Sequence, residues 1–443
     1  MIRVPRLRSL IPLLVLLLLV GLIGQQVVLR WRAAPVLVGT VMIGLDAWAL
    51  AVDVPSGHVF VSNSSAGTLS VLDAGSGTVL HTIALTGIPN QIAVDGRTRR
   101  AFVLNDATNT MSVLDAATGT LVQTLHFTAV HDLAIDEARN RVLVVGLRPD
   151  GASEVSILDA RSGRVRRAIP NALDSWGLAL DARSGRVLVT NRGDGTLSVL
   201  DAARGHVVRT VPVGTHPTGV VVDARDGHAF VANTGDSALA TGGTISMLDA
   251  RQGTVLRTVW VGRDPATVVV DASTSRVFVV HGRGGSKGLR ADSGAGGTDV
   301  LDARSGRVLH MLAVGALPVD DVGTALYPHM VALDEQRGHL FVINRTLRDR
   351  AGQPTAGSVS VFDAVSGRVL HTIAVGWAPM ALAVDETTAR LFVVNKDGGG
   401  LLGNSQSNWA WVPHAWRSWL PFLLVPPRPS RASNVTVIDI AQL

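Results

Sequence analysis

Histidines and aspartates stand just before several similar apolar segments of this 443-residue chain. His131 and His329 lie five residues before an aspartate that ends such a segment, and His216 lies seven residues before one. Imidazole and carboxylate groups that converge from separate segments are typical ligands of a divalent metal. In other copies of these segments the position five residues before the aspartate is Trp48 or Trp176, and the position seven residues before it is Asp46, Asp174 or Asp264. His281 stands at the end of a neighbouring apolar segment.

Two interpretations of these residues stay open. In one, His131, His216 and His329 bind a divalent metal with help from the aspartates. In the other, the side chains line a polar opening and are bridged by water. The chain has no cysteine, which excludes disulfides, thiol nucleophiles and cysteine-ligated zinc. No His-Glu-x-x-His pair occurs, and the glycine-rich stretch His281–Gly288 does not lead into a predicted helix, so the sequence predicts no catalytic set.

The elements that position these residues belong to a repeat, seen most clearly from Trp176 to Gly214. Four short apolar segments, GLALD, RVLVTN, TLSVLDA and VVRTVPVG, have the alternation and the valine content of antiparallel strands, here called a to d. The hexapeptide DARSGR joins strands a and b in this copy and strands c and d in another. Aspartate accepts nearby backbone hydrogen bonds and glycine takes positive φ, so these aspartates are predicted to cap turns.

Eight copies of the repeat follow one another, so the fold class is predicted to be all-β, an eight-bladed β-propeller over residues 36–443. Seven blades would require one copy to be displaced. The eighth copy lacks strand d, and Val36–Gly44 resembles strand d of the other copies. The N-terminal segment is therefore expected to complete the last blade and close the ring.

Strand b carries the motif of a known repeat family. It appears as FVSN, FVLN, LVTN, FVAN, FVIN and FVVN in six copies, and Gly146 and His281 replace the asparagine in the third and sixth copies. The chain resembles the YVTN family of bacterial β-propeller repeats, with phenylalanine or leucine in place of the tyrosine. The resemblance implies the fold and leaves the function open.

Length changes between copies fall almost wholly in the b–c connections, which share one face of a propeller with the d–a connections. We call this the upper face. The largest insertion, Lys396–Asn434, contains Trp409, Trp411, Trp416 and Trp419. Such a segment suits a lid on its own propeller, a partner-binding patch or a membrane-interface hairpin. Because functional residues concentrate on loops held by a rigid scaffold, the upper face is expected to carry the function.

The N-terminus is predicted to direct the propeller out of the cytoplasm. Three arginines precede an apolar run, Leu10–Leu29, that is long enough to cross a bilayer. Residues 1–30 are interpreted as a signal anchor in the cell membrane, with secretion after cleavage near Gly24 as the alternative. The net charge of +5 comes from arginines scattered through turns, so no nucleic-acid partner is expected.

Three functions remain after these steps. The first is a tethered, extracytoplasmic binding or scaffolding module whose partner is a protein or a cell-surface ligand. The second is an enzyme at the funnel mouth, either metal-dependent or lactonase-like. The third is an accessory subunit of a membrane complex.

Overall fold

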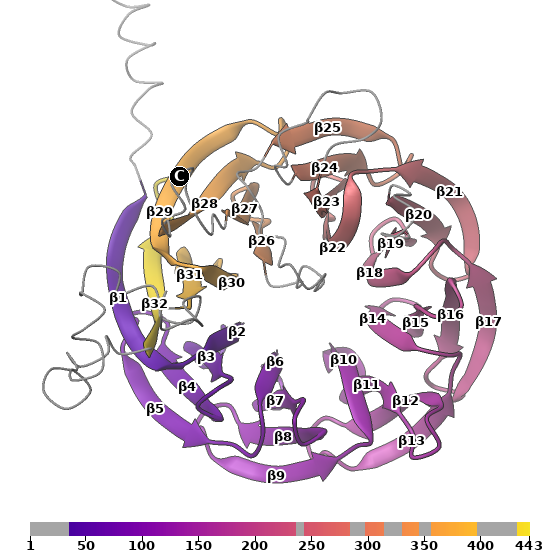
Figure 1. Ribbon diagram of the computed structural model, residues 1–443, viewed down its shortest axis with the longest axis horizontal. Helices are drawn as coiled ribbons and strands as arrows, with labels where there is room; N and C mark the ends of the chain where they lie inside the picture. Colours follow the sequence, from indigo (N-terminus) through magenta and orange to yellow (C-terminus); the bar gives the residue numbers. More distant parts are fainter. Residues whose placement is uncertain (1–34, 236–242, 284–296, 314–329, 345–355, 397–431) are drawn as a thin grey trace, which may run out of the picture.

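The chain folds as a ring of eight four-stranded antiparallel sheets around a central channel (Figure 1). The computed structural model describes residues 35–235, 243–283, 297–313, 330–344, 356–396 and 432–443. Eight blades confirm the predicted count and dismiss the seven-bladed alternative. No helix in these ranges is both long and apolar enough to cross a membrane, and the predicted anchor, residues 1–30, lies outside them.

Each blade contributes one strand to each of four concentric layers. Strand a lines the channel in β2 (Ala47–Asp53), β6 (Pro89–Asp95), β10 (Ala129–Asp136), β14 (Ser175–Asp181), β18 (Pro217–Asp223), β22 (Arg263–Asp271), β26 (Val331–Asp334) and β30 (Pro379–Asp385). Strand b follows as β3 (His58–Asn63), β7 (Arg100–Asn105), β11 (Arg141–Leu147), β15 (Arg186–Asn191), β19 (His228–Asn233), β23 (Arg276–Arg283), β27 (His339–Asn344) and β31 (Arg390–Asn395).

The two outer layers follow the same order. Strand c is β4 (Thr68–Asp73), β8 (Thr110–Asp115), β12 (Ser153–Asp159), β16 (Thr196–Asp201), β20 (Thr244–Asp249), β24 (Gly297–Asp302), β28 (Ala356–Asp363) and β32 (Ala432–Asp439). Strand d is β5 (Val79–Ala84), β9 (Leu121–His126), β13 (Val165–Pro170), β17 (His206–Pro212), β21 (Thr254–Trp260), β25 (Val308–Ala313), β29 (Val369–Trp377) and β1 (Val36–Leu45). A 3₁₀ turn, Glu137–Arg139, connects β10 and β11.

The ring closes as the sequence predicts. Blade eight has the strand order β1-β32-β31-β30, so the N-terminal strand pairs with the C-terminal one. Val41 lies opposite Val435 in this antiparallel pair. Closure places the last blade's third strand between two neighbours and leaves no open end of the array.

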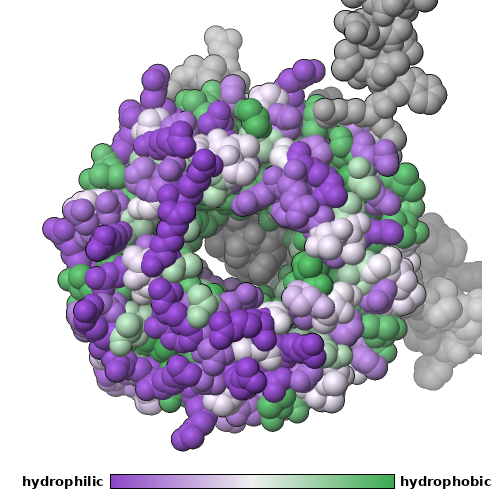
Figure 2. Space-filling model, turned by 180° about the vertical axis from the view of Figure 1, so that it is seen from behind, coloured by the Kyte–Doolittle hydropathy of each residue, from purple (hydrophilic) through white to green (hydrophobic). Residues whose placement is uncertain are grey.

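The core consists of apolar layers between neighbouring blades. Strand b is buried on both faces, and the phenylalanine that replaces the motif tyrosine is fully buried, as at Phe60 and Phe102. A phenol at this depth would need a hydrogen-bond partner, whereas phenylalanine needs none. Strand d is largely exposed, as in β5. Figure 2 shows the ring from behind, with hydrophilic residues covering most of that face around the central opening.

The motif asparagine fastens strand b to strand c. Asn63 is buried and donates from Nδ2 to Thr68 Oγ1 at 3.0 Å and to Ser70 Oγ at 2.9 Å. A Cβ on Gly44 would lie 2.6 Å from Asn63 Cγ, so glycine is required where the outer strand passes over this side chain. The same donor pattern to the serine or threonine of strand c recurs at Asn105, Asn191, Asn233, Asn344 and Asn395.

The repeated aspartates cap turns, as predicted. Asp181 Oδ1 accepts a hydrogen bond from the backbone N–H of Arg183 at 3.1 Å, and the Asp181 carbonyl accepts one from Gly185 at 2.8 Å. Gly185 has a φ of 71°. These a–b turns and the similar c–d turns form the face opposite the upper face, which we call the lower face. The turn chemistry therefore accounts for the strand-end aspartates without any ligand.

Candidate functional site: the upper mouth of the channel

The inner strands begin at the upper mouth of the channel, where the sequence placed its candidate residues (Figure 1). Trp48 lies in β2, His131 in β10 and Trp176 in β14, at equivalent positions of blades one, three and four. All three side chains are half-buried. The mouth therefore presents aromatic and imidazole rings from separate blades on one rigid scaffold.

Three of these mouth residues form a compact group, which we call the Trp176 stack. The His131 and Trp176 rings are stacked, with centroids 5.0 Å apart and planes inclined by 20°. The guanidinium carbon of Arg192 lies 5.2 Å from the centroid of the Trp176 ring. This distance is within the range of a cation–π interaction, and Arg192 is exposed. The stack joins blades three and four through side chains alone.

Charges around the stack act in opposite directions on His131. Partial burial lowers the pKa of His131, because desolvation disfavours the imidazolium. The carboxylates of Asp174 and Asp106 offset only part of this lowering. His131 therefore favours its neutral form at neutral pH and can both donate and accept a hydrogen bond.

Asp132, beside His131 on β10, links three blades across the channel wall. Its Oδ1 accepts hydrogen bonds from Gln91 Nε2 at 2.7 Å and from the backbone N–H of Leu133 at 2.8 Å. Its Oδ2 accepts one from the backbone N–H of Leu178 at 2.9 Å. Burial nevertheless raises the pKa of Asp132 to about 6, since the three donors do not replace the lost hydration.

A second cation lies over the other mouth tryptophan. Lys396 Nζ is 5.7 Å from the centroid of the Trp48 ring and 3.1 Å from Asp46 Oδ1. Asp46 also accepts a hydrogen bond from Ser65. Lys396 and Arg192 both directly follow the motif asparagine of strand b. Sequence reasoning missed them; comparing this position across the copies shows which copies carry a cation there, but the contact of Lys396 with Trp48 joins blades eight and one and follows only from ring closure.

A left-handed backbone conformation explains the residue type at four of the candidate positions. Asp46, Asp174, His216 and Asp264 all have left-handed backbone conformations, with φ between 49° and 53°. Aspartate, asparagine and histidine are the non-glycine residues most often found there. The carbonyl of the first three accepts a hydrogen bond from the residue after strand b, as in Arg192 N–H to Asp174 O at 2.8 Å. Their residue types therefore follow from the turn, whatever else they do.

His281 lies inside blade six and not on the open surface of the mouth. Its side chain is buried, and its Nε2 lies 3.5 Å from Oδ1 of the buried Asp299. These residues occupy the positions that asparagine and serine hold in other blades. Here the asparagine–serine hydrogen bond of the other blades is replaced by a buried His281–Asp299 approach without a hydrogen bond.

The predicted metal site stays a prediction. Within the described ranges, no three histidine, aspartate or glutamate side chains come close enough together to hold a metal ion. His131 belongs to blade three and His216 precedes β18 of blade five, where its Nδ1 lies 3.0 Å from the Gly235 carbonyl oxygen. His329 lies outside the described residues, as do the four tryptophans of the predicted partner patch, Trp409, Trp411, Trp416 and Trp419.

Comparison with known proteins supports the fold. No protein-family model matches the chain, and no curated protein matches it. A solved structure of a functionally unknown protein from Desulfotomaculum acetoxidans DSM 771 is similar, with a TM-score of 0.53 and 17% identity over 72% of this chain and 95% of that one. Dihydro-heme d1 dehydrogenase NirN in complex with DHE is also similar, with a TM-score of 0.54 and 16% identity over 74% of this chain and 66% of that one. At these identities the likeness establishes the propeller fold alone.

Proposed function

We propose that this propeller is a binding module that takes a protein or cell-surface ligand at its upper mouth. The Trp176 stack carries the proposal. Tryptophan and arginine are the side chains most enriched among residues that dominate binding energy, and here both are held by the scaffold beside His131. A half-buried indole with an exposed guanidinium offers both apolar area and a charged hydrogen-bond donor.

Site-specific photocrosslinking tests this proposal. A photoreactive residue at Arg192 should capture a partner that the same residue at Trp260 does not capture. Trp260 is a matched position because it is an exposed tryptophan on the outer strand β21. With the purified partner, Trp176→Ala should weaken binding about 30-fold, the loss typical of a dominant residue. Trp260→Ala should leave binding unchanged, and equal affinities for both variants would refute the proposal.

The membrane tether and the family belong to the same proposal. The apolar run in residues 1–30 supports a signal anchor, and the strand-b motif supports membership of the YVTN repeat family. Because the chain lacks cysteine, single cysteines at Ala66 and Ala117 report on the upper and lower faces without background. Both alanines are exposed. A membrane-impermeant maleimide should label the two variants in intact cells, and labelling only after lysis would overturn the topology.

A second candidate function, an enzyme at the channel mouth, is favoured by one observation. Asp132, with its pKa raised to about 6, is the sequence neighbour of His131, whose pKa is lowered. A carboxyl whose pKa is raised to about 6 suits general acid–base catalysis. Hydrolysis of lactone and ester panels, with and without added divalent metal, tests this candidate. Turnover that His131→Ala does not reduce would refute it.

A further inference from the structure

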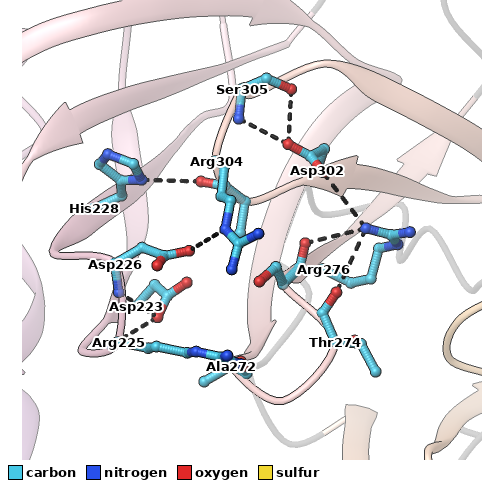
Figure 3. Close-up of polar contacts among 12 residues, drawn as sticks. Asp223, Arg225, Asp226, His228, Ala272, Thr274, Arg276, Asp302, Arg304 and Ser305 are labelled. Atoms are coloured by element: carbon cyan, nitrogen blue, oxygen red, sulfur yellow. Dashed lines mark hydrogen bonds and ion pairs between the residues drawn. The ribbon is translucent and has the colours of Figure 1, made fainter.

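A cleft on the lower face between blades four and five is lined mainly by arginine. Its volume is about 580 Å³, and the guanidinium groups come from the turns of both blades. The arginines are Arg183, Arg186, Arg204, Arg225 and Arg251. Three carboxylates share the lining, which leaves two more positive than negative side chains. Figure 3 shows the adjoining turns, where Arg225 reaches toward Ala272 and Arg304 reaches toward Asp226.

The carboxylates of the cleft already have partners. Asp201 lies 2.8 Å from both Arg186 Nη1 and Arg204 Nη1, and it accepts backbone hydrogen bonds from its own turn. The Arg204 backbone hydrogen bond and the arginine charges hold the pKa of Asp201 at about 2. Asp226 pairs at 3.1 Å with Arg304, which comes from blade six and is not part of the cleft lining. Asp181 accepts hydrogen bonds from the Arg183 backbone N–H and the Ser184 hydroxyl in its own turn. Asp201 therefore offsets one charge of the Arg186 and Arg204 pair, and Asp226 pairs with a residue outside the cleft.

The cleft keeps an excess of two positive side chains, and its other three arginines are not held by ion pairs among the described residues. Arg183 Nη1 donates to the Arg225 carbonyl at 2.8 Å, and Arg225 Nη1 donates to the Ala272 carbonyl at 2.9 Å. A carbonyl fixes the position of a guanidinium without cancelling its charge. Arg251 is exposed, and none of the three forms an ion pair within the described part of the chain. Guanidinium groups held in place in this way are suited to bidentate recognition of an oxyanion.

The corresponding region between blades seven and eight carries glutamates in its turns. There Arg337, one position further along its turn than Arg183, also donates to a carbonyl of the next blade, that of Glu386 at 3.1 Å. Its neighbourhood carries Glu335 and Glu386, and the Glu386 carboxylate accepts from the Glu335 backbone N–H at 2.8 Å. The inter-blade arginine bond is therefore a structural feature of the repeat. Ala182 and Ala224 stand at the cleft between blades four and five where this region has Glu335 and Glu386, so the two regions differ in charge.

We propose that this cleft binds a phosphate-type oxyanion through Arg183, Arg225 and Arg251. A phosphate group offers oxygens to several guanidinium groups at once, and a cleft of about 580 Å³ leaves room for a substituent on the phosphate. The shared chemistry fits two sources, a free phosphate compound or the headgroup of an anionic lipid. This cleft lies on the face opposite the upper mouth, so anion binding here can be tested independently of the ligand proposed at the mouth.

Binding experiments on the full chain with two matched variants test the site. Arg251→Gln removes one charge from the cleft and breaks no hydrogen bond of the described structure, whereas Arg161→Gln removes the equivalent exposed arginine of blade three, outside the cleft. Calorimetry with inorganic phosphate and pyrophosphate examines the free anion. Co-sedimentation with vesicles of phosphatidylcholine, with or without phosphatidylglycerol, examines the headgroup. Thermal unfolding confirms that both variants remain folded.

The expected result is that Arg251→Gln weakens anion binding about tenfold while Arg161→Gln leaves it within twofold of the unchanged protein. Binding of pyrophosphate identifies a free phosphate compound as the source. Binding only to vesicles that contain phosphatidylglycerol, with the same loss in Arg251→Gln, identifies a lipid headgroup. Failure of both probes to bind, or equal losses in the two variants, would overturn the proposal.

Discussion

Replacing Asp132 by asparagine should change how the stability of the propeller depends on pH. The pKa of this carboxyl rises from 3.8 to about 6 in the folded chain. Between these values the folded state keeps a proton that the unfolded state has lost. The free energy of unfolding therefore falls as pH rises through this window and is constant above it. The stabilising contribution of the protonated Asp132 is therefore complete only below pH 3.8, the pKa of this carboxyl in the unfolded chain.

The size of the effect follows from the shift. About two pKa units at 1.36 kcal/mol each set an upper limit of ~3 kcal/mol, and because Asp132 is only half-buried, solvent screening reduces the effect to about 1–2 kcal/mol. Asparagine cannot ionise, so Asp132→Asn lacks this slope. The variant also loses one acceptor, because its amide nitrogen would face the backbone N–H of Leu178. At pH 4 it should be less stable than the unchanged protein by about 1 kcal/mol, and the deficit should disappear or reverse at pH 7.

Urea unfolding from pH 3.5 to 7.5 measures both quantities. The difference in unfolding free energy between Asp132→Asn and the unchanged protein should move in favour of the variant by about 1–2 kcal/mol across the window. Asp150→Asn, which changes an exposed aspartate of the same blade, is the control and should follow the unchanged protein. A difference for Asp132→Asn that is flat across the window would show that burial does not raise this pKa.

Three further predictions concern the scaffold. Asn191→Ala should destabilise the chain by about 1–3 kcal/mol more than Asn63→Ala, measured by thermal unfolding, because Asn191 Oδ1 accepts from Asn171 and Ser175 whereas Asn63 Oδ1 has no partner among the described residues. Deletion of residues 36–45 should expose β32 as an edge strand and cause oligomerisation, detectable by light scattering; a monodisperse monomer would contradict the role of β1 in closure. Arg183→Gln should cost about 1–2 kcal/mol of unfolding free energy through its inter-blade bond, and a neutral effect would show that this bond is dispensable.

Sequence periodicity was sufficient to predict the fold because each structural requirement recurs eight times. The aspartate and glycine of the turns, the apolar second strand and the asparagine at its end each specify local geometry. The missing outer strand of the last copy and the extra segment at the N-terminus then specify closure. None of these steps requires knowledge of contacts between blades.

The site was only partly predictable because its contacts join blades. The positions of His131 and Trp176 follow from the repeat, but their stacking depends on the rotation between blades three and four. Asp132 drew no attention in the sequence, since its importance comes from Gln91 and Leu178 on the two neighbouring blades. Conversely, Asp174 was weighed as a ligand, although its left-handed backbone already accounts for its residue type.

The buried pair in blade six shows how far comparison within the repeat can reach. His281 replaces the motif asparagine, and Asp299 replaces the serine that normally accepts its hydrogen bond. An imidazole is larger than an amide, and the blade makes room for it with Gly297, at a position that Thr68 and Thr196 hold in other blades. A Cβ on Gly297 would lie 2.5 Å from His281 Cε1, whereas Gly262 is the counterpart of Gly44 beside Asn63. Both partners of one contact therefore change together in one chain, and such paired changes locate a contact between strands without any homologous sequence.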